Sequence, residues 1–284
     1  MKYNPIVAPV LKWVGGKRQL LKEILPLIPK NISTYYEPFV GGGAVLFALQ
    51  PKKAIINDYN EELINVYKII KDNPDELIKI LQIHKENNNS EYFYKIREID
   101  RSSDYINLNT IERAARIIYL NKTCYNGLYR VNQAGQFNSP FGKYKNPNIV
   151  NSPTVKAMHD YFNNSNITVT SGDYKETLQK IRAKTKSFVY LDPPYFPLSS
   201  SSSFTGYTDN GFGEKQQIEL KNECDKLNKK EIKFLLSNSS CSFIEDLYKQ
   251  DYNIKIIKAK RVLNSDGNKR GEIDEVLISN YDIL

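Results

Sequence analysis

The stretch FVYLDPPY, residues 188–195, constrains the fold of this chain more than any other stretch. Its first four residues are apolar or aromatic without polar alternation, as in a parallel strand that is buried on both faces. Pro193 and Pro194 lack the backbone N–H groups that a central strand needs, so the strand has to end before them. We therefore expect Asp192 and Tyr195 at the carboxyl end of a central strand, where open α/β sheets bind ligands.

Other strand-like segments alternate with helix-like ones along the chain. The strand-like segments are residues 34–39, 52–60, 166–173 and 232–240, followed by an antiparallel pair near YNIKIIKAKR and DEVLISNY. A helical pattern, EELINVYKII, comes directly after the second of them. This alternation predicts the α/β class, with a Rossmann-like, doubly wound and mostly parallel sheet.

The alternation breaks between about residues 61 and 150. Helical periodicity appears in DELIKILQIHKE and IERAARIIYL, where Asn109 and Glu112 form a candidate capping box, and a turn-rich segment follows. We expect one domain made of residues 1–60 and 151–284, and an inserted, mainly helical domain of residues 61–150.

Charge and composition limit the classes of partner that this chain can have. The formal net charge of +8 favours an anionic partner, although charge alone does not separate nucleic acid from a membrane surface. The N-terminus lacks the pattern of a signal peptide, and no apolar run approaches the ~18 residues of a membrane-spanning helix. Three scattered cysteines and two histidines offer neither a disulfide framework nor a structural zinc site. We expect a cytoplasmic protein that binds no membrane and no metal.

The segment from Arg113 to Asn148 is basic, aromatic and free of Asp and Glu. Its basic side chains are Arg113, Arg116, Lys122, Arg130, Lys143 and Lys145. Its aromatic side chains include Tyr119, Tyr125, Tyr129, Phe137, Phe141 and Tyr144. Such mixtures suit phosphate contacts, base stacking and the recognition of base edges. The segment therefore favours nucleic-acid binding over a merely solvated basic face.

Two glycine-containing turns are candidate ligand sites. EPFVGGG (37–43) allows close backbone approach before a helix, but Leu46 occupies the third glycine position of the dinucleotide fingerprint. KWVGGKR (12–18) lacks the spacing of a nucleotide-hydrolysing P-loop and ends in Arg18. Asp58, at the end of the next strand, is either an acid for ribose hydroxyls or a helix N-cap.

The D-P-P-Y stretch itself suits an aromatic ring that carries an amino group. Asp192 and the carbonyl of Pro193 can accept hydrogen bonds from an exocyclic amine, and Tyr195 can lie flat on a planar base.

Together these motifs resemble the DNA adenine-N6 methyltransferases of the Dam and DpnM type. The order is the alpha-type order, with F-x-G-x-G at Phe39, Gly41 and Gly43, then the insertion, then D-P-P-Y. Residues 125–147, YNGLYRVNQAGQFNSPFGKYKNP, are similar to the target-recognition hairpin of that family. The resemblance implies S-adenosylmethionine as methyl donor without a metal, double-stranded DNA as substrate and GATC as target. It makes residues 1–60 and 151–284 the cofactor-binding catalytic domain, and residues 61–150 the target-recognition domain.

The resemblance also implies the roles of individual residues. The catalytic group is Asp192, Pro193, Pro194 and Tyr195, and the cofactor group is Trp13, Lys17, Phe39, Gly41, Gly43, Asp58, Asp173 and Asp192. The DNA-binding group is Lys12, Tyr125, Asn126, Leu128, Arg130, Pro140, Tyr144 and Lys145, in which Arg130 bonds a guanine of the site. The serine run 199–203 is more uniform than the corresponding loop of the family.

The expected reaction is methyl transfer to an adenine flipped out of duplex DNA. Alternatives are an adenine methyltransferase with a different or longer site, an RNA adenine methyltransferase, and a cytosine-N4 methyltransferase. A non-catalytic DNA-binding module is the alternative from a different class. A restriction endonuclease acting on the same site, without physical contact, is a possible partner, and a housekeeping role stays open beside it.

Overall fold

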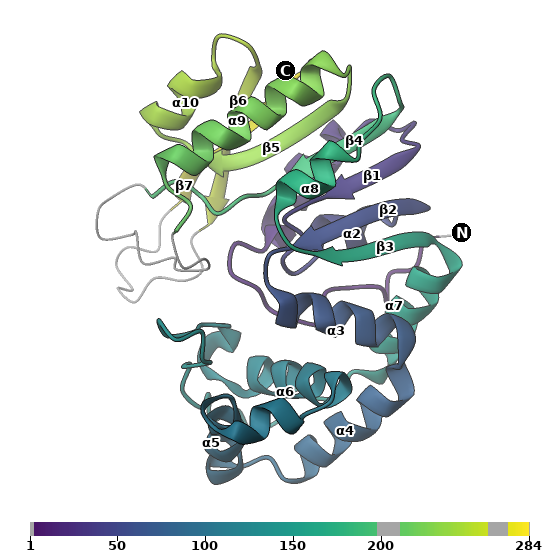
Figure 1. The fold of residues 1–284 in the computed structure, drawn as a ribbon, viewed down its shortest axis with the longest axis vertical. Helices are drawn as coiled ribbons and strands as arrows, with labels where there is room; N and C mark the ends of the chain where they lie inside the picture. The colour runs from purple at the N-terminus through teal and green to yellow at the C-terminus, as the bar shows by residue number, and fades with distance from the viewer. Residues whose placement is uncertain (1–2, 198–210, 261–271, 284) are drawn as a thin grey trace. The chain divides into compact units, whose positions relative to one another are not determined.

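The computed structural model describes residues 3–197, 211–260 and 272–283, and in it seven strands form one mostly parallel sheet (Figure 1). Their order is β3-β2-β1-β4-β5-β7-β6. β1 pairs in parallel with β2 and β4, β4 pairs in parallel with β5, and β7 runs antiparallel to β5 and β6. The α/β class and the mostly parallel sheet predicted from the sequence are confirmed. The strands are β1 (Thr34–Glu37), β2 (Lys53–Asp58), β3 (Asn166–Ser171), β4 (Ser187–Leu191), β5 (Lys233–Ser239), β6 (Asn253–Lys260) and β7 (Glu272–Ser279).

Helices connect most of these strands. The α-helices are α1 (Leu21–Ile24), α2 (Ala44–Leu49), α3 (Glu61–Asp72), α4 (Pro74–Glu86), α5 (Ser90–Glu98), α6 (Thr110–Thr123), α7 (Ser152–Asn164), α8 (Tyr174–Gln179), α9 (Glu214–Lys229) and α10 (Ser242–Tyr248). Short 3₁₀ helices are η1 (Lys17–Leu20), η2 (Leu25–Leu27), η3 (Ile99–Arg101), η4 (Ser103–Asn107) and η5 (Tyr125–Gly127).

Local sequence signals set several of these boundaries. All five residues of β4 are buried, and the strand ends at Leu191, before the two prolines. The capping box at the start of α6 is confirmed, because Asn109 accepts from the backbone of Glu112 and Glu112 accepts from the backbone of Asn109. The N-cap of α3 is Asn60 rather than Asp58.

The chain packs as two compact units. Unit 1 comprises Met1–Gly16, Gly41–Lys52 and Asn60–Ser171, and unit 2 comprises Lys17–Val40, Lys53–Tyr59 and Gly172–Leu284. These units follow from packing and have other bounds than the two domains expected from the sequence, which stay a prediction.

Unit 2 has its core between the sheet and a helical layer. In Figure 1, α8 and α9 lie across the strands β4 and β5. Apolar residues on these strands, among them Val189 and Leu236, form one cluster with Leu178 of α8, Leu220 of α9 and Ile244 of α10. Burying this cluster stabilises unit 2, since apolar burial contributes roughly 25 cal/mol per Å².

Unit 1 has an aromatic core. Phe47 of α2 lies 6.1 Å from Tyr67 of α3 and 6.0 Å from Phe162 of α7, measured between ring centroids. Farther along the unit, Tyr119 of α6 stacks on His84 of α4 with the ring centroids 4.8 Å apart. α6 thus has a buried face against α3, α4 and α5.

The serine run 199–203 lies outside the described residues. Over the ranges that the structure describes, no helix is both long and apolar enough to cross a membrane.

Candidate functional site

Asp192 follows β4 directly and its carboxylate is held on one side only. Its Oδ1 accepts from the ammonium of Lys17 and from the hydroxyl of Ser237 on β5, each at 2.9 Å. Lys17 is itself buried at the start of η1. Among the described residues, none donates a hydrogen bond to Asp192 Oδ2 or to the carbonyl of Pro193. Oδ2 and this carbonyl therefore keep acceptor capacity.

Tyr195 is fixed at both its ring and its hydroxyl. The hydroxyl donates to Glu275 Oε2 on β7 at 2.7 Å, and the ammonium of Lys17 lies 4.5 Å from the ring centroid. A cation over one face of the ring is a favourable cation–π contact. Lys17 thus contacts both Asp192 and Tyr195, so this buried cation joins two of the predicted catalytic residues.

The backbone of the D-P-P-Y stretch is held by side chains from two other elements. Gln217 of α9 donates to the carbonyl of Pro194 at 3.0 Å, and Asn238 of β5 accepts from the backbone of Phe196 at 3.1 Å. Gln217 and Asn238 are buried and bonded to each other. These residues, together with Ser237 and Glu275, were not found from the sequence, because none of them belongs to a recognisable motif.

Burial shifts the pKa values of the two carboxyl groups at this site. Burial raises the pKa of Asp192 above its usual range, and the nearby charge of Lys17 opposes that shift. Burial likewise raises the pKa of Glu275, and again the charge of Lys17 opposes the shift. Two carboxylates with raised pKa values around one ammonium are typical of a functional site.

The loops at the ends of β1, β2 and β3 are held together by Asn57. Its side chain donates to the carbonyl of Pro38 at 3.2 Å and to that of Gly172 at 2.8 Å. This places Phe39 beside Tyr174, with ring centroids 4.8 Å apart. The adjacent Asp173 caps α8 by accepting from the backbone of Lys175 at 2.8 Å, so the structure gives this predicted cofactor residue a capping contact.

In unit 1 the glycine turn and the N-terminal motif lie against each other. Gly41 and Gly43 have φ angles of +47° and +70°, which favour glycine. A Cβ atom at Gly41 would lie 3.1 Å from the Trp13 ring, and one at Gly43 would lie 2.6 Å from the Phe47 ring. Trp13 also stacks on Tyr129 at 4.8 Å between centroids. Three predicted cofactor residues are thus close together in this unit.

The residues for which the resemblance implies DNA contacts are all in unit 1 and mostly exposed. Leu128 is half-buried, while the exposed ones are Lys12, Tyr125, Asn126, Arg130, Pro140, Tyr144 and Lys145. The turn-rich segment has two isolated antiparallel bridges, between Cys124 and Phe141 and between Val131 and Phe137.

Buried Asn121 joins two parts of this exposed set. Its amide exchanges two hydrogen bonds of 2.9 Å with the backbone of Lys12 and donates a third, of 3.0 Å, to the carbonyl of Gly127. Lys12 and the turn Tyr125–Gly127 are therefore held by one side chain of α6. No sequence motif indicates this role for Asn121.

Part of the basic and aromatic segment faces inward, which corrects the expectation that it contacts nucleic acid as a whole. Arg116 is buried and forms a 2.8 Å ion pair with Asp100, and Arg113 forms an ion pair with Glu62. A second group from the segment is also buried, namely Tyr119, Tyr129 and Phe137. The acidic partners lie outside the acid-free window, so the window's charge overstated what faces solvent.

No metal-binding cluster is found in the part of the chain that the structure describes. Groups of three or more His, Cys, Asp or Glu side chains placed to hold an ion are absent from that part.

Comparison with known proteins gives a consistent family. The family described as "D12 class N6 adenine-specific DNA methyltransferase" matches residues 13–263. The chain is 45% identical over 273 residues to the type II methyltransferase M1.LlaDCHI of Lactococcus lactis subsp. cremoris, covering 96% of this chain and 95% of that protein. It is 43% identical over 293 residues to the type II methyltransferase M.MjaIII of Methanocaldococcus jannaschii, covering 97% and 99%. It is 35% identical over 270 residues to the DNA adenine methylase of Escherichia coli K12, covering 94% and 93%.

Proposed function

This chain belongs to the D12 class of N6 adenine-specific DNA methyltransferases, and we propose that it transfers the methyl group of S-adenosylmethionine to an adenine within GATC in duplex DNA. The observation that carries this proposal is that only one of the two carboxylate oxygens of Asp192 accepts hydrogen bonds from described residues. Its Oδ1 is fixed by Lys17 and Ser237, and Oδ2 accepts from none of the described residues.

The unused acceptors suit an exocyclic amine. Asp192 Oδ2 and the carbonyl of Pro193 accept the two N6 hydrogens, which turns the nitrogen lone pair out of conjugation with the ring. The adenine reaches them by flipping out of the stack, at a cost of a few kcal/mol. Tyr195 offers the base one face of its ring, since the other carries the Lys17 ammonium. Pro194 stiffens the turn, and its carbonyl is bonded to Gln217.

The residues in the loops after β1, β2 and β3 suit the binding of S-adenosylmethionine, the methyl donor. Asp58 is an acid at the end of β2 that suits ribose hydroxyls, Phe39 is a flat surface for a base, and Asp173 lies next to Tyr174. Trp13 with Gly41 and Gly43 forms the remaining cofactor contacts, and Lys17 orients the Asp192 carboxylate while its charge opposes the rise in the pKa of Asp192. When bound, this cofactor supplies an electrophilic methyl group. Its transfer to N6 would break the S–C bond as the N–C bond formed, and the amine would release a proton to solvent.

Lys12 and the exposed side chains of residues 125–145 contact the DNA. Arg130 bonds a guanine of the site through its guanidinium, while Leu128 and Pro140 contact base edges. Tyr125, Asn126, Tyr144 and Lys145 intercalate, orient the strand or bind phosphate. Support for this assignment comes from their exposure and from the fixation of Lys12 and the Tyr125–Gly127 turn by Asn121.

A restriction endonuclease that cleaves the same site is the proposed biological partner. Two relatives, which are 45% and 43% identical to this chain, are named type II methyltransferases. Methylation by the present enzyme would block cleavage by such a nuclease without physical contact between the two proteins.

The test is a methyl-transfer assay with labelled S-adenosylmethionine and matched duplexes that contain GATC or a scrambled site. We expect label on the adenine of GATC alone. Label in other adenine contexts would keep the reaction and overturn the target sequence. Label in RNA or on cytosine, with none on DNA adenine, would overturn the substrate.

Arg130→Ala sharpens this test. We expect it to reduce discrimination against duplexes that lack one G·C pair of the site by about tenfold, because a bidentate arginine–guanine contact contributes roughly 1–3 kcal/mol of discrimination. Equal weakening on all duplexes would instead mean that Arg130 contacts phosphate.

A further inference from the structure

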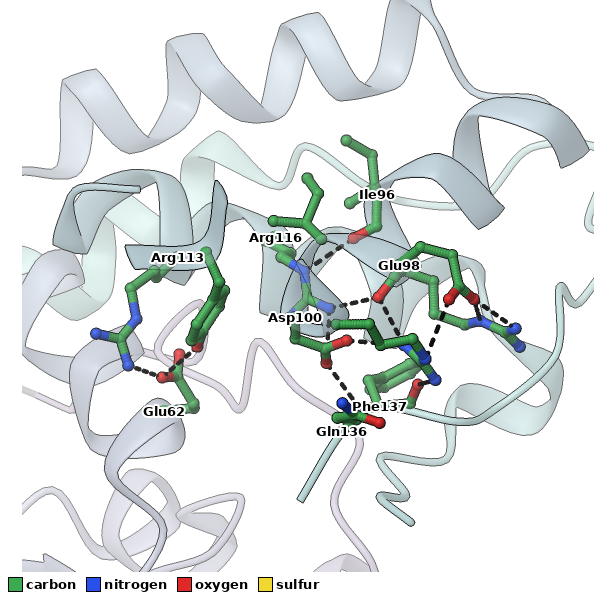
Figure 2. Close-up of polar contacts among 12 residues, drawn as sticks. Glu62, Ile96, Glu98, Asp100, Arg113, Arg116, Gln136 and Phe137 are labelled. Carbon is green, nitrogen blue, oxygen red and sulfur yellow. Dashed lines mark hydrogen bonds and ion pairs between the residues drawn. The ribbon is translucent and has the colours of Figure 1, made fainter. Parts of the chain in front are cut away.

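A largely buried carboxylate next to α6, that of Asp100, bonds to the turn-rich segment of unit 1; its side chain is 11% exposed. Asp100 Oδ2 accepts from Arg116 and from the backbone N–H of Phe137, each at 2.8 Å. Its Oδ1 accepts from Arg101 at 2.7 Å. Figure 2 shows Asp100 between the guanidinium of Arg116 and the backbone of Phe137.

Arg101 completes this contact from the same short helix, η3. Its Nη2 donates to the carbonyl of Phe137 at 2.7 Å, and its Nη1 donates to Asp100. Both backbone groups of Phe137 are therefore bonded to side chains of the helical part of unit 1. The guanidinium has the forked shape that two such bonds require, which a lysine ammonium lacks.

Residues 130–138 fold back on themselves as a short hairpin, and the position of Phe137 in this 130–138 hairpin makes the contact possible. The backbone of Asn138 donates to Arg130 at 2.9 Å, and that of Asn132 donates to Gln136 at 2.8 Å. Phe137 lies between these two hydrogen-bonded positions, opposite Val131. Its N–H and C=O consequently point out of the hairpin, where Asp100 and Arg101 meet them.

The residue next to Phe137 holds the side chain of Arg130. Asn138 Oδ1 accepts from Arg130 Nε at 2.8 Å. A shift of one residue between the two strands would turn Asn138 to the opposite face and release this contact. The direction of the Arg130 guanidinium therefore depends on the register that Phe137 fixes.

Stability alone gives no reason for this arrangement. A buried ion pair is often no more stabilising than apolar side chains of similar volume, because both charges lose their hydration. Apolar side chains could fill the same space, but they could not bond the N–H and C=O of Phe137. The polar groups of Asp100 and Arg101 are thus matched to the backbone of the hairpin.

We propose that Asp100 and Arg101 are positioning residues for target recognition, which set the register of the 130–138 hairpin and through Asn138 the direction of Arg130. This inference rests on the proposed function, in which Arg130 contacts a guanine of the site.

The experiment compares Arg101→Ala, Arg101→Lys and Arg97→Ala in the full chain. For each variant, kcat and KM are measured on GATC duplexes and on duplexes in which one G·C pair of the site is replaced by A·T. Arg97 is the matched control, because it is a neighbouring cation whose side chain contacts neither Asp100 nor Phe137 and shares only the Glu98 carboxylate with Arg101. Thermal unfolding of each variant reports whether the fold is kept.

We expect Arg101→Ala to lower the ratio of kcat/KM between cognate and altered duplexes about tenfold, with the loss falling mainly on KM. Arg101→Lys keeps the charge but not the fork, so it should restore only part of the ratio. Arg97→Ala should leave the ratio unchanged. If Arg101→Ala unfolds, a partial loss of the ratio in folded Arg101→Lys, with Arg97→Ala unchanged, is the deciding result.

Three results would overturn the inference. An unchanged ratio in both Arg101 variants, with Arg130→Ala still relaxing it, would reject the positioning role and leave the proposed function intact. A loss of the same size in Arg97→Ala would show a general charge effect. A wild-type enzyme that methylates altered and cognate duplexes equally would overturn the proposed target and this inference together.

Discussion

Each unit has a largely buried ion pair, and the carboxylates of the two pairs are hydrogen-bonded to different extents. In unit 2, Asp192 is bonded through one oxygen to Lys17 and Ser237, and its other oxygen accepts from no described residue. In unit 1, both oxygens of Asp100 are used by arginines and by a backbone N–H. A carboxylate with unused acceptor capacity can bind an amine, whereas a fully bonded one can only hold the protein in place.

The charge balance of the two sites differs as well. Lys17 faces two carboxylates, Asp192 and Glu275, and burial raises the pKa of both. Asp100 instead faces two guanidinium groups, those of Arg101 and Arg116. The first site therefore destabilises its own ionised form, and the second provides a full set of donors for it. This contrast leads to opposite expectations for substitutions at the two sites.

The largest expected effect is the loss of methyl transfer in Asp192→Ala. Removing the acceptor for the amine should lower the single-turnover rate by at least about 10²–10³-fold, as for other preorganised polar groups. DNA binding, measured by fluorescence anisotropy, should be largely kept. Ser237→Ala is the control, since it removes one donor to Oδ1 and keeps the carboxylate. Retention of a tenth or more of the rate in Asp192→Ala would remove the distinction between the two sites.

Arg116→Met tests the fully bonded site. It leaves Asp100 buried without one of its cations, which should lower the free energy of unfolding by about 3 kcal/mol. Urea denaturation measures this change. Arg97→Met, whose side chain pairs with a half-exposed carboxylate, should change stability by less than about 0.5 kcal/mol. Similar losses in both variants would mean that burial of the pair is not what matters.

His84 tests whether a buried polar atom without a hydrogen-bond partner affects stability rather than catalysis. Its Nε2 is buried without a hydrogen-bond partner among the described residues, and burial lowers its pKa from 6.5 to about 4. Because the folded state disfavours the proton, the stabilising contribution is complete above pH 6.5 and is lost as the pH falls toward 4. The loss should be about 1.4 kcal/mol per pH unit. Equal pH slopes in wild type and His84→Phe, by urea denaturation, would contradict this expectation.

Glu275→Gln should have the smallest effect and the opposite sign. Its raised pKa means that ionised Glu275 destabilises the folded state, so the substitution should raise the melting temperature at pH 8. The difference should fade as the pH falls through the raised pKa toward the ordinary value of 4.5, since Glu275 is then protonated. Asp274→Asn on the same strand is the control, because Asp274 is exposed and paired with exposed Lys258. A lower melting temperature in Glu275→Gln would show that the carboxylate stabilises unit 2.

The parts that the sequence predicted depend on local signals. An apolar run followed by two prolines is enough to define β4 and its end, and Asn109 with Glu112 defines the start of α6. Both signals act within a few residues, so the residues that end the strand or cap the helix are adjacent in the sequence.

The contacts that complete the site depend on residues far apart in the chain. Asp192 meets Lys17 and Ser237 only because η1, β4 and β5 come together in the folded unit. Arg116 is buried by its contact with Asp100, which lies outside the segment whose charge was counted. A charge count along a window contains no information on such partners, and that is why it overestimates how much of the segment is exposed.

The tip of the 130–138 hairpin is closed by its own residues. Asn132 Oδ1 accepts from the backbones of Ala134 and Gln136, and its carbonyl accepts from Gly135. A Cβ atom at Gly135 would meet nothing within 4 Å. The bonds of the tip stay within the tip, and Phe137 is held separately by Asp100 and Arg101. The tip is therefore a suitable place to insert another loop. Loops from related enzymes, or a reporter group, could be exchanged there without rebuilding the rest of the protein.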